Sequence, residues 1–254
     1  MLATGVAGFD RLFGQGGLAR NALHEVVTDE VRGGGAAAGF VVALLARAAA
    51  AGVAGAVLWA SDAFAAREAG GPPYGPGLAA LGLDPGRLLR VEGGSVADVL
   101  WALEEGLGSG ALFAVVGEVL GRPSVLDLTA SRRLLLRARE GGRTAVLLRH
   151  AAAEAAPSAA AARIRVAPHP SAAAFGPGRP VWHLSVEKNR DGPVGSAVME
   201  WDPHERAFRD PAPHPRRVAA APVDRPAGAV VALRPPATDE PGRQGPPAVR
   251  AGAS

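Results

Sequence analysis

Alternating strands and helices in the first 150 residues constrain the fold more than any other feature of the sequence. Five short apolar runs are typical of buried strands: residues 23–27, 55–60, 88–91, 111–116 and 144–149. Three stretches between them have helical length and apolar spacing: residues 36–51, 95–107 and 124–140. Repeated units of strand, helix and strand predict an α/β fold with a mostly parallel central sheet and helices on both faces.

The second half of the chain carries a different pattern. Three strand-like segments follow one another with no long helix between them: residues 162–168, 181–189 and 195–202. In the middle segment Trp182, Leu184 and Val186 alternate with polar residues, which is the period of a strand with one buried face. We therefore expect antiparallel strands added at the C-terminal edge of the sheet.

Composition separates a folded core, residues 1–210, from a tail, residues 211–254. The tail is rich in Pro, Ala and Arg and has almost no aromatic residues, so it buries too little apolar area to offset its ordering entropy. Its arginines also account for the net charge of +3, because the charges of the core balance. We expect a disordered tail, and the high pI gives no reason to expect a nucleic-acid-binding core.

Several classes of protein and site are excluded by the residues that are missing. The chain has no Cys, and its six His residues show no metal-ligand spacing, so neither disulfides nor a metal centre is expected. No apolar run reaches the roughly 18 uncharged residues that a membrane span needs. The first residues lack the basic-then-apolar pattern of a signal peptide. We expect a soluble cytoplasmic protein.

Residues 28–40 lead from the first strand into the first helix through three consecutive glycines. A glycine-rich turn from strand to helix is where many α/β proteins hold a phosphate. A working loop also needs a Lys for the β- and γ-phosphates and a Ser or Thr for Mg²⁺. Ala37, Ala38 and Gly39 occupy those positions. The loop residues that remain are predicted to be vestigial: Gly33, Gly34, Gly35 and Gly39.

Several longer segments resemble known families. Residues 3–27 resemble the opening of RecA-type recombinases, with Thr4-Gly5 and Phe9-Asp10 at matching positions. Four further segments are similar to the ImuA family: residues 74–93, 98–118, 126–149 and 195–202. The resemblance to this family of RecA-like accessory proteins covers about residues 3–209, nearly the whole predicted core.

This resemblance implies a RecA-like core and a role in DNA-damage-induced mutagenesis of the SOS type. It also implies that the protein acts in translesion synthesis together with two partners, an ImuB-like inactive Y-family polymerase and an error-prone replicative-type polymerase. RecA is a further possible partner. Contact with DNA would be indirect. We expect a non-catalytic interaction protein without a cofactor, which leaves open whether it self-associates or retains weak ATP binding.

The carboxylates that serve nucleotide chemistry in the recombinases are also displaced. Gly117 stands where the resemblance places a metal-binding Asp, and Glu118 comes one residue later. Because side chains alternate along a strand, we expect Glu118 to point away from the loop. Asp62 lies near the position of the water-activating carboxylate, but a turn or helix N-cap is the simpler prediction.

Basic and aromatic residues supply the candidates for binding DNA or a partner. Lys188 and Arg190 match a basic pair that acts across the subunit interface of the recombinases, although a solvated strand end explains them equally simply. The helix at 124–140 carries a basic stripe of Arg132, Arg133, Arg137 and Arg139. Tyr74 lies in a Pro/Gly-rich loop and either contacts a partner or packs under the loop. The four tryptophans are expected in the core: Trp59, Trp101, Trp182 and Trp201.

Two alternative functions remain open at this stage. In a weak ATPase, Arg32, Lys188 or Arg190 would replace the missing Lys. In a dinucleotide-binding enzyme, the glycines at 33, 35 and 39 would approximate a Rossmann fingerprint, and Asp62 would bind the ribose. No hydride-transfer site follows in the sequence, which disfavours the second alternative.

Overall fold

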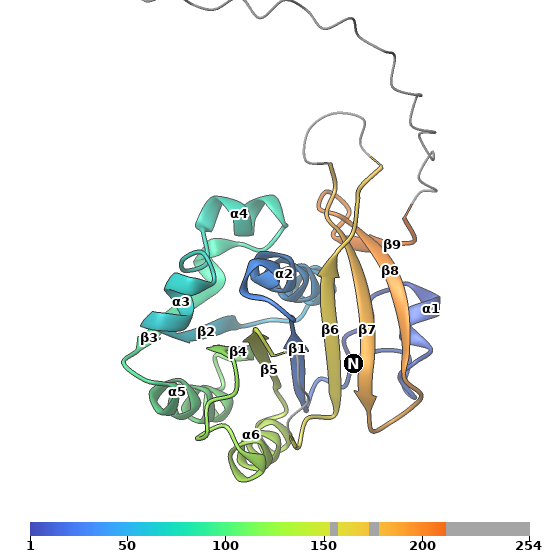
Figure 1. The fold of residues 1–254 in the computed structure, drawn as a ribbon. Coiled ribbons are helices and arrows are strands. Elements are labelled where there is room, and N and C mark those ends of the chain that lie inside the picture. Colours follow the sequence, from blue (N-terminus) through green and yellow to red (C-terminus); the bar gives the residue numbers. More distant parts are fainter. Residues whose placement is uncertain (153–156, 173–177, 212–254) are drawn as a thin grey trace, which may run out of the picture. The chain divides into compact units, whose positions relative to one another are not determined.

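A computed structural model describes residues 1–152, 157–172 and 178–211 (Figure 1). The predicted tail therefore lies, except for Pro211, outside the described residues. The strands are β1 (Leu23–Val27), β2 (Ala56–Asp62), β3 (Leu88–Gly93), β4 (Leu112–Leu120), β5 (Thr144–His150), β6 (Ala162–Pro168), β7 (Val181–Asn189), β8 (Gly195–Asp202) and β9 (Ala207–Arg209). The helices are α1 (Ala7–Asp10), α2 (Gly34–Ala50), α3 (Ala63–Glu68), α4 (Gly75–Ala80), α5 (Val96–Gly108) and α6 (Leu128–Gly141), with short 3-10 turns η1 (Val31–Gly33) and η2 (Pro85–Arg87).

All described strands belong to one sheet with the order β3-β2-β4-β5-β1-β6-β7-β8-β9. The six strands from β3 to β6 run parallel, and β7, β8 and β9 are antiparallel additions. The predicted mixed α/β architecture is confirmed. One detail is wrong, because β6 pairs parallel with β1 rather than antiparallel. After β5 the chain re-enters the sheet beside β1, and β6 runs in the same direction as β1.

Helices cover the two faces of this sheet and create two apolar cores (Figure 1). On one face, α2 packs Phe40 and Leu45 against Trp182 and Trp201, and β9 completes this core with Phe208. On the other face, α5 and α6 contribute a second set of buried side chains: Leu103, Leu107, Leu134 and Leu135. Only strands with apolar residues on both faces fit between two such layers, which explains the continuous apolar runs of β4 and β5.

Hydrogen bonds to the Asp10 carboxylate hold the N-terminal segment together, and Arg47 joins it to α2. Asp10 accepts hydrogen bonds from the Thr4 N–H at 2.9 Å, the Thr4 hydroxyl at 2.8 Å and the Gly5 N–H at 2.8 Å. Arg47, near the end of α2, donates to the Ala3 carbonyl at 2.8 Å. The Thr4-Gly5 and Phe9-Asp10 pairs in the opening of the chain therefore have a structural role, because they stabilise the conformation of this segment.

Three features of the structure differ from the sequence-based expectations: the start of α6, the position of Trp101 and the length of one apolar helical stretch. Helix α6 begins at Leu128, four residues after the predicted start, because the Asp127 carboxylate caps it by accepting from the Ala130 N–H at 2.7 Å. Trp101 is not a core residue, since it lies on the outer side of α5 and is 66% exposed. Residues 31–50 form a helical stretch apolar and long enough to span a membrane, but most of it is buried as the core helix α2.

Candidate functional site

The glycine segment after β1 is helical in the structure. Gly33 and Gly34 both have right-handed helical backbone angles, and η1 runs directly into α2. The Gly33 N–H donates to the Glu30 carbonyl at 3.2 Å, and the Gly34 N–H donates to Val31. Both N–H groups therefore donate within the helical stretch, whose first turn starts at Val31. A phosphate loop needs the opposite arrangement, with several N–H groups converging on a ligand.

Two acidic residues, Asp29 and Glu30, lie at the N-terminus of this helical stretch. Glu30 is the N-cap residue of η1, and its carbonyl accepts from the Thr28 hydroxyl at 2.8 Å. Asp29 precedes it and pairs with Arg165 of β6. Negative side chains at a helix N-terminus are stabilised by the helix dipole, and they repel a phosphate from the same place. Arg32 lines a groove beside these two acids rather than the face of α2 that carries Gly35 and Gly39.

A buried polar cluster lies directly under Gly34 at the ends of β2, β4 and β5. The Glu118 carboxylate accepts from the Trp59 indole N–H at 2.9 Å and lies 2.7 Å from His150 Nε2. All three side chains are at most 3% exposed. A Cβ added to Gly34 would lie 2.7 Å from His150 Nδ1, so the imidazole fills the space against the start of α2. We call Trp59, Glu118 and His150 the buried triad.

The expectation that Glu118 points away from the glycine segment is wrong. A Cβ on Gly117 would lie 2.5 Å from Leu103 of α5, so Gly117 faces the α5 side of the sheet. Alternation along β4 then directs Glu118 to the α2 side, where it meets His150. The sequence contained a signal for this arrangement, because Glu118 and His150 are polar residues near the C-terminal ends of mostly apolar strands.

A cavity of about 270 Å³ opens between the first half of α2 and the α3–α4 segment. Its lining residues include Gly35, Gly39, Trp59, Pro72, Pro73, Tyr74, Leu78, Leu81 and Glu118. None of the described residues that line it is Lys or Arg, so nothing there balances the charge of a phosphate. Tyr74 is 72% exposed at the rim as the N-cap residue of α4, and it does not pack under its loop.

Asp62 has a structural function that its position predicted. Its carboxylate accepts from the Ala65 N–H at 2.9 Å and caps α3. This geometry is that of an ordinary N-cap. Among residues 1–152, 157–172 and 178–211, no group of three or more acidic, His or Cys side chains is arranged to hold a metal ion.

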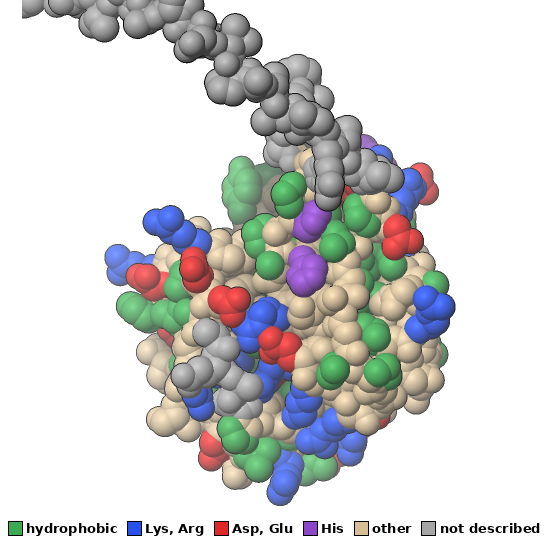
Figure 2. Space-filling view, turned by 45° about the vertical axis from the view of Figure 1, so that its right-hand side comes forward, with side chains coloured by type: hydrophobic (Ala, Val, Ile, Leu, Met, Phe, Trp, Pro, Cys, Tyr) green, Lys and Arg blue, Asp and Glu red, His purple; other side chains and the backbone are tan. Residues whose placement is uncertain are grey.

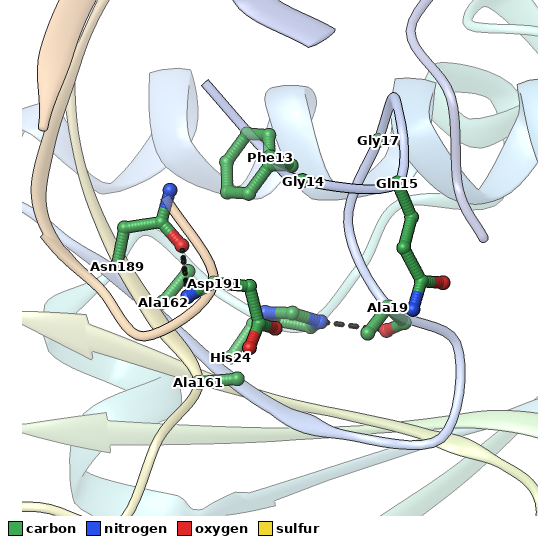
Figure 3. Close-up of a pocket in the computed structure, with 10 residues that line it drawn as sticks. All are labelled: Phe13, Gly14, Gln15, Gly17, Ala19, His24, Ala161, Ala162, Asn189 and Asp191. Atoms are coloured by element: carbon green, nitrogen blue, oxygen red, sulfur yellow. Dashed lines mark hydrogen bonds between the residues drawn. The ribbon is translucent and has the colours of Figure 1, made fainter. Parts of the chain in front are cut away.

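The end of β7, which carries Lys188, and the turn after it, which carries Arg190, are bound to the rest of the chain through Asn189 and Asp191 (Figure 3). Asn189 donates to the Leu12 carbonyl at 2.6 Å and accepts from the Asp191 N–H at 3.1 Å. His24 lies beside Asp191 and bonds through Nε2 to the Ala19 carbonyl at 2.8 Å, while its Nδ1 faces a cavity of about 10 Å³. A space of that size is at the lower limit for one water molecule. Burial lowers the pKa of His24 from its ordinary value of 6.5.

Lys188 belongs to a cluster of charges on the α6 side of β1, β6 and β7. Its amine donates to the Ser158 carbonyl, and its pKa is lowered by burial and then by the nearby Arg190. Buried Glu25 pairs there with Arg163 at 2.7 Å and with Arg149 at 3.5 Å. Figure 2 shows acidic side chains lying among the basic ones across the middle of the face it presents. Lys188 thus has a structural partner, whereas Arg190 is exposed.

The basic stripe on α6 is partly neutralised. Arg133 pairs with Glu104 of α5 at 2.7 Å, and Arg137 lies 3.7 Å from Glu140. Arg132 is exposed on the same helix. Two large apolar side chains also stand out from this two-helix surface, with Trp101 66% and Leu136 49% exposed. We call this surface, formed by Trp101, Arg132, Arg133, Leu136 and Arg137, the α5–α6 face.

Comparison with known proteins agrees with this geometry. The chain is 32% identical over 250 residues to Protein ImuA of Caulobacter vibrioides, in strains NA1000/CB15N and ATCC 19089/CIP 103742/CB 15, covering 92% of this chain and 95% of each relative. No family model matches the chain. Its fold is similar to that in the crystal structure of the RadB recombinase, with a TM-score of 0.56 and 15% identity over 84% of this chain and 100% of that one. The fold is therefore RecA-like.

Proposed function

The chain belongs to the ImuA family and has that family's role in mutagenesis, and from this premise we propose that it acts as a non-catalytic interaction protein. It supports translesion synthesis in the SOS-type damage response by binding an ImuB-like inactive Y-family polymerase in the cytoplasm. Through that partner it reaches an error-prone replicative-type polymerase, RecA and DNA. ATP is neither a substrate nor a required cofactor.

One observation carries the non-catalytic part of this proposal. The segment that would cradle a triphosphate is wound into helix, and the His150 ring fills the space against Gly34. To bind a phosphate there, the chain would have to unwind η1 and displace a fully buried imidazole from Glu118. Neither the glycines nor any described basic residue lining the adjoining cavity offers the charge that would compensate for this cost.

A thermal-shift panel tests the absence of nucleotide binding. ATP with Mg²⁺, a non-hydrolysable ATP analogue and NAD should each leave the melting temperature unchanged. A ligand present at 100 times its dissociation constant would add about 2.7 kcal/mol to the free energy of unfolding, which raises the melting temperature of a domain of this size by roughly 5–10 °C. A shift with ATP would support the weak-ATPase alternative, and a shift with NAD the dinucleotide-binding one.

The α5–α6 face is the surface we propose for the polymerase-like partner. Trp and Arg are the residues most enriched at binding hot spots, and an exposed Trp on a regular helix buries little apolar area until a partner covers it. Trp101 and Leu136 supply the apolar side chains of this face, and Arg132 supplies positive charge beside Arg133 and Arg137, which Glu104 and Glu140 partly neutralise. The partner surface that fits this arrangement is apolar with an acidic rim.

Matched variants test this surface in a pull-down with the ImuB-like protein. Trp101→Ala should weaken capture at least tenfold, since removal of a hot-spot residue costs about 2 kcal/mol or more. Phe64→Ala is the control, because Phe64 is 64% exposed on α3, away from α5 and α6. Equal binding by wild type and Trp101→Ala would refute this assignment.

Charge variants separate the partner from DNA. Lys188→Ala with Arg190→Ala, and separately Arg132→Ala with Arg137→Ala, are compared for binding to the partner and to a DNA duplex. Direct contact with phosphates makes the affinity fall steeply with added salt. We expect weak DNA binding that does not depend on either pair, whereas a steep salt dependence lost in one double variant would establish direct DNA contact.

A further inference from the structure

Strand β3 forms an open edge of the sheet. It pairs on one side with β2 from Leu88 to Gly93, and no described strand lies on its other side (Figure 1). The β2–β3 ladder has no register shift, and β3 contains no Pro. Leu89 is 54% exposed on this edge. Natural sheets usually protect an edge with charged side chains, Pro, a bulge or a covering element. The two charges of β3, Arg90 and Glu92, are of opposite sign, so this regular edge with an exposed Leu is suited to pairing with a strand of complementary charge.

We propose that β3 is the contact for a second copy of this chain, with the two β3 strands pairing antiparallel around a two-fold axis at Val91. This register places Arg90 of each copy directly opposite Glu92 of the other. Directly opposite residues lie on the same face of a sheet and interact most strongly. Within one chain Arg90 and Glu92 already share a face, 3.7 Å apart and each about half exposed. The dimer therefore carries a square of four charges in which each neighbouring pair, along a strand or across the contact, is of opposite sign.

The same charges select this register over its neighbours. Moving the two-fold axis by one residue places Arg90 opposite Arg90, or Glu92 opposite Glu92. Like charges directly opposite each other destabilise a strand pair. The segment Arg90-Val91-Glu92 is thus complementary to itself in one antiparallel register only, as a two-fold contact requires.

The other face of the strand supports the same arrangement. In this register Leu89 lies opposite Gly93 of the second copy and diagonal to its Val91. Gly93 is required by its own fold, because an added Cβ would lie 2.9 Å from the Asp98 Cβ. The Asp98 Cβ and the Ser95 carbonyl already occupy the space over Gly93, so the Leu89 side chain of the other copy is directed toward Val91. Pairing would cover the most exposed apolar group of the edge.

Charge-reversal variants test the proposal through the oligomeric state, measured by sedimentation or light scattering of the full chain. The strand contact is smaller than a standard interface of about 1,600 Å², so the measurement is made at high concentration, roughly 100 μM. Wild type should dimerise, and Arg90→Glu and Glu92→Arg should each be monomeric. Mixing the two variants should restore a heterodimer, because every opposing pair is again of opposite sign. Arg20→Glu, an exposed site away from the edge, is the control for the change in net charge.

Three outcomes would overturn the proposal. Wild type remains monomeric at the highest concentration, or both single variants dimerise like wild type, or the mixture stays monomeric although both variants unfold at the wild-type temperature. This dimer is independent of the proposed docking function, since the α5–α6 face and nucleotide binding are measured by separate assays.

Discussion

Replacing Gly34 by Ala tests how the start of α2 is packed. An Ala Cβ at this position would lie 2.7 Å from His150 Nδ1 and 2.8 Å from His150 Cε1. The ring is fully buried and lies 2.7 Å from Glu118, so making room for the Cβ means shifting a buried, hydrogen-bonded imidazole. Gly35→Ala is the matched control in the same helix, where an added Cβ meets no atom within 4 Å.

The expected magnitudes follow from three contributions. In both variants Ala gains about 1 kcal/mol over Gly through helix propensity. Overpacking a rigid interior costs about 1–3 kcal/mol, and loosening the buried bond between His150 and Glu118 costs about 1–3 kcal/mol more. Gly35→Ala should therefore stabilise the protein, and Gly34→Ala should be less stable than Gly35→Ala by about 2–6 kcal/mol.

Urea unfolding and thermal melts of the two variants provide the assay. The difference corresponds to roughly 4–24 °C in melting temperature for a domain of this size. Adding His150→Ala to Gly34→Ala should remove the steric part, so the effects of the two substitutions should not add. If Gly34→Ala proves as stable as Gly35→Ala, the His150 ring does not occupy the space against Gly34, and the argument for a blocked phosphate site fails with it.

Three further predictions concern other parts of the molecule. Burial holds the pKa of His24 below 6.5, so its contribution to stability is present above that pH and lost as the pH falls toward the folded-state pKa; the free energy of unfolding should fall more steeply below pH 6.5 in wild type than in His24→Gln. Trp101→Ala should change stability by less than about 0.5 kcal/mol because the side chain is exposed, whereas Trp59→Ala should cost about 3–5 kcal/mol, which denaturant unfolding distinguishes. Arg190 lowers the pKa of Lys188, so Arg190→Ala should raise it, measured by NMR on the chain's single Lys, and an unchanged or lower pKa would contradict the assigned contact.

Local patterns predicted most of the fold because the responsible interactions are local or periodic. The helix at 95–107 was readable from its apolar spacing and from Ser95, which caps α5 by accepting from the Asp98 N–H at 3.3 Å. The same spacing excludes Trp101 from the buried face, and a core position was expected only because Trp is usually buried. The direction of β6 depends on where a connection brings the chain back, and no local pattern encodes that.

The candidate site was less predictable because it depends on contacts between distant strands. Missing Lys, Ser and Thr side chains in residues 33–39 indicated a weakened phosphate loop, but composition does not reveal whether a glycine segment forms a loop or a helix. The buried triad joins residues from three strands that are far apart in sequence. Glu118 was assigned to the wrong side because the alternation of β4 was counted from an expected Asp, and not from Gly117 packing on Leu103.

The glycine segment before α2 is stabilised by contacts within the chain. The α2 core is held by aromatic and aliphatic side chains that include Phe40, Trp182 and Phe208. Winding residues 31–33 into helix satisfies N–H groups that a bound phosphate would otherwise accept from. Beneath that turn Glu118 bonds to His150 Nε2 and to the Trp59 indole, while the buried His150 Nδ1, next to Gly34, has no hydrogen-bond partner. A single His-to-Lys replacement would therefore not recreate a phosphate site: it would leave η1 helical and introduce a buried cation at the base of the cavity, so His150→Lys should be less stable than His150→Gln and should still show no thermal shift with ATP and Mg²⁺.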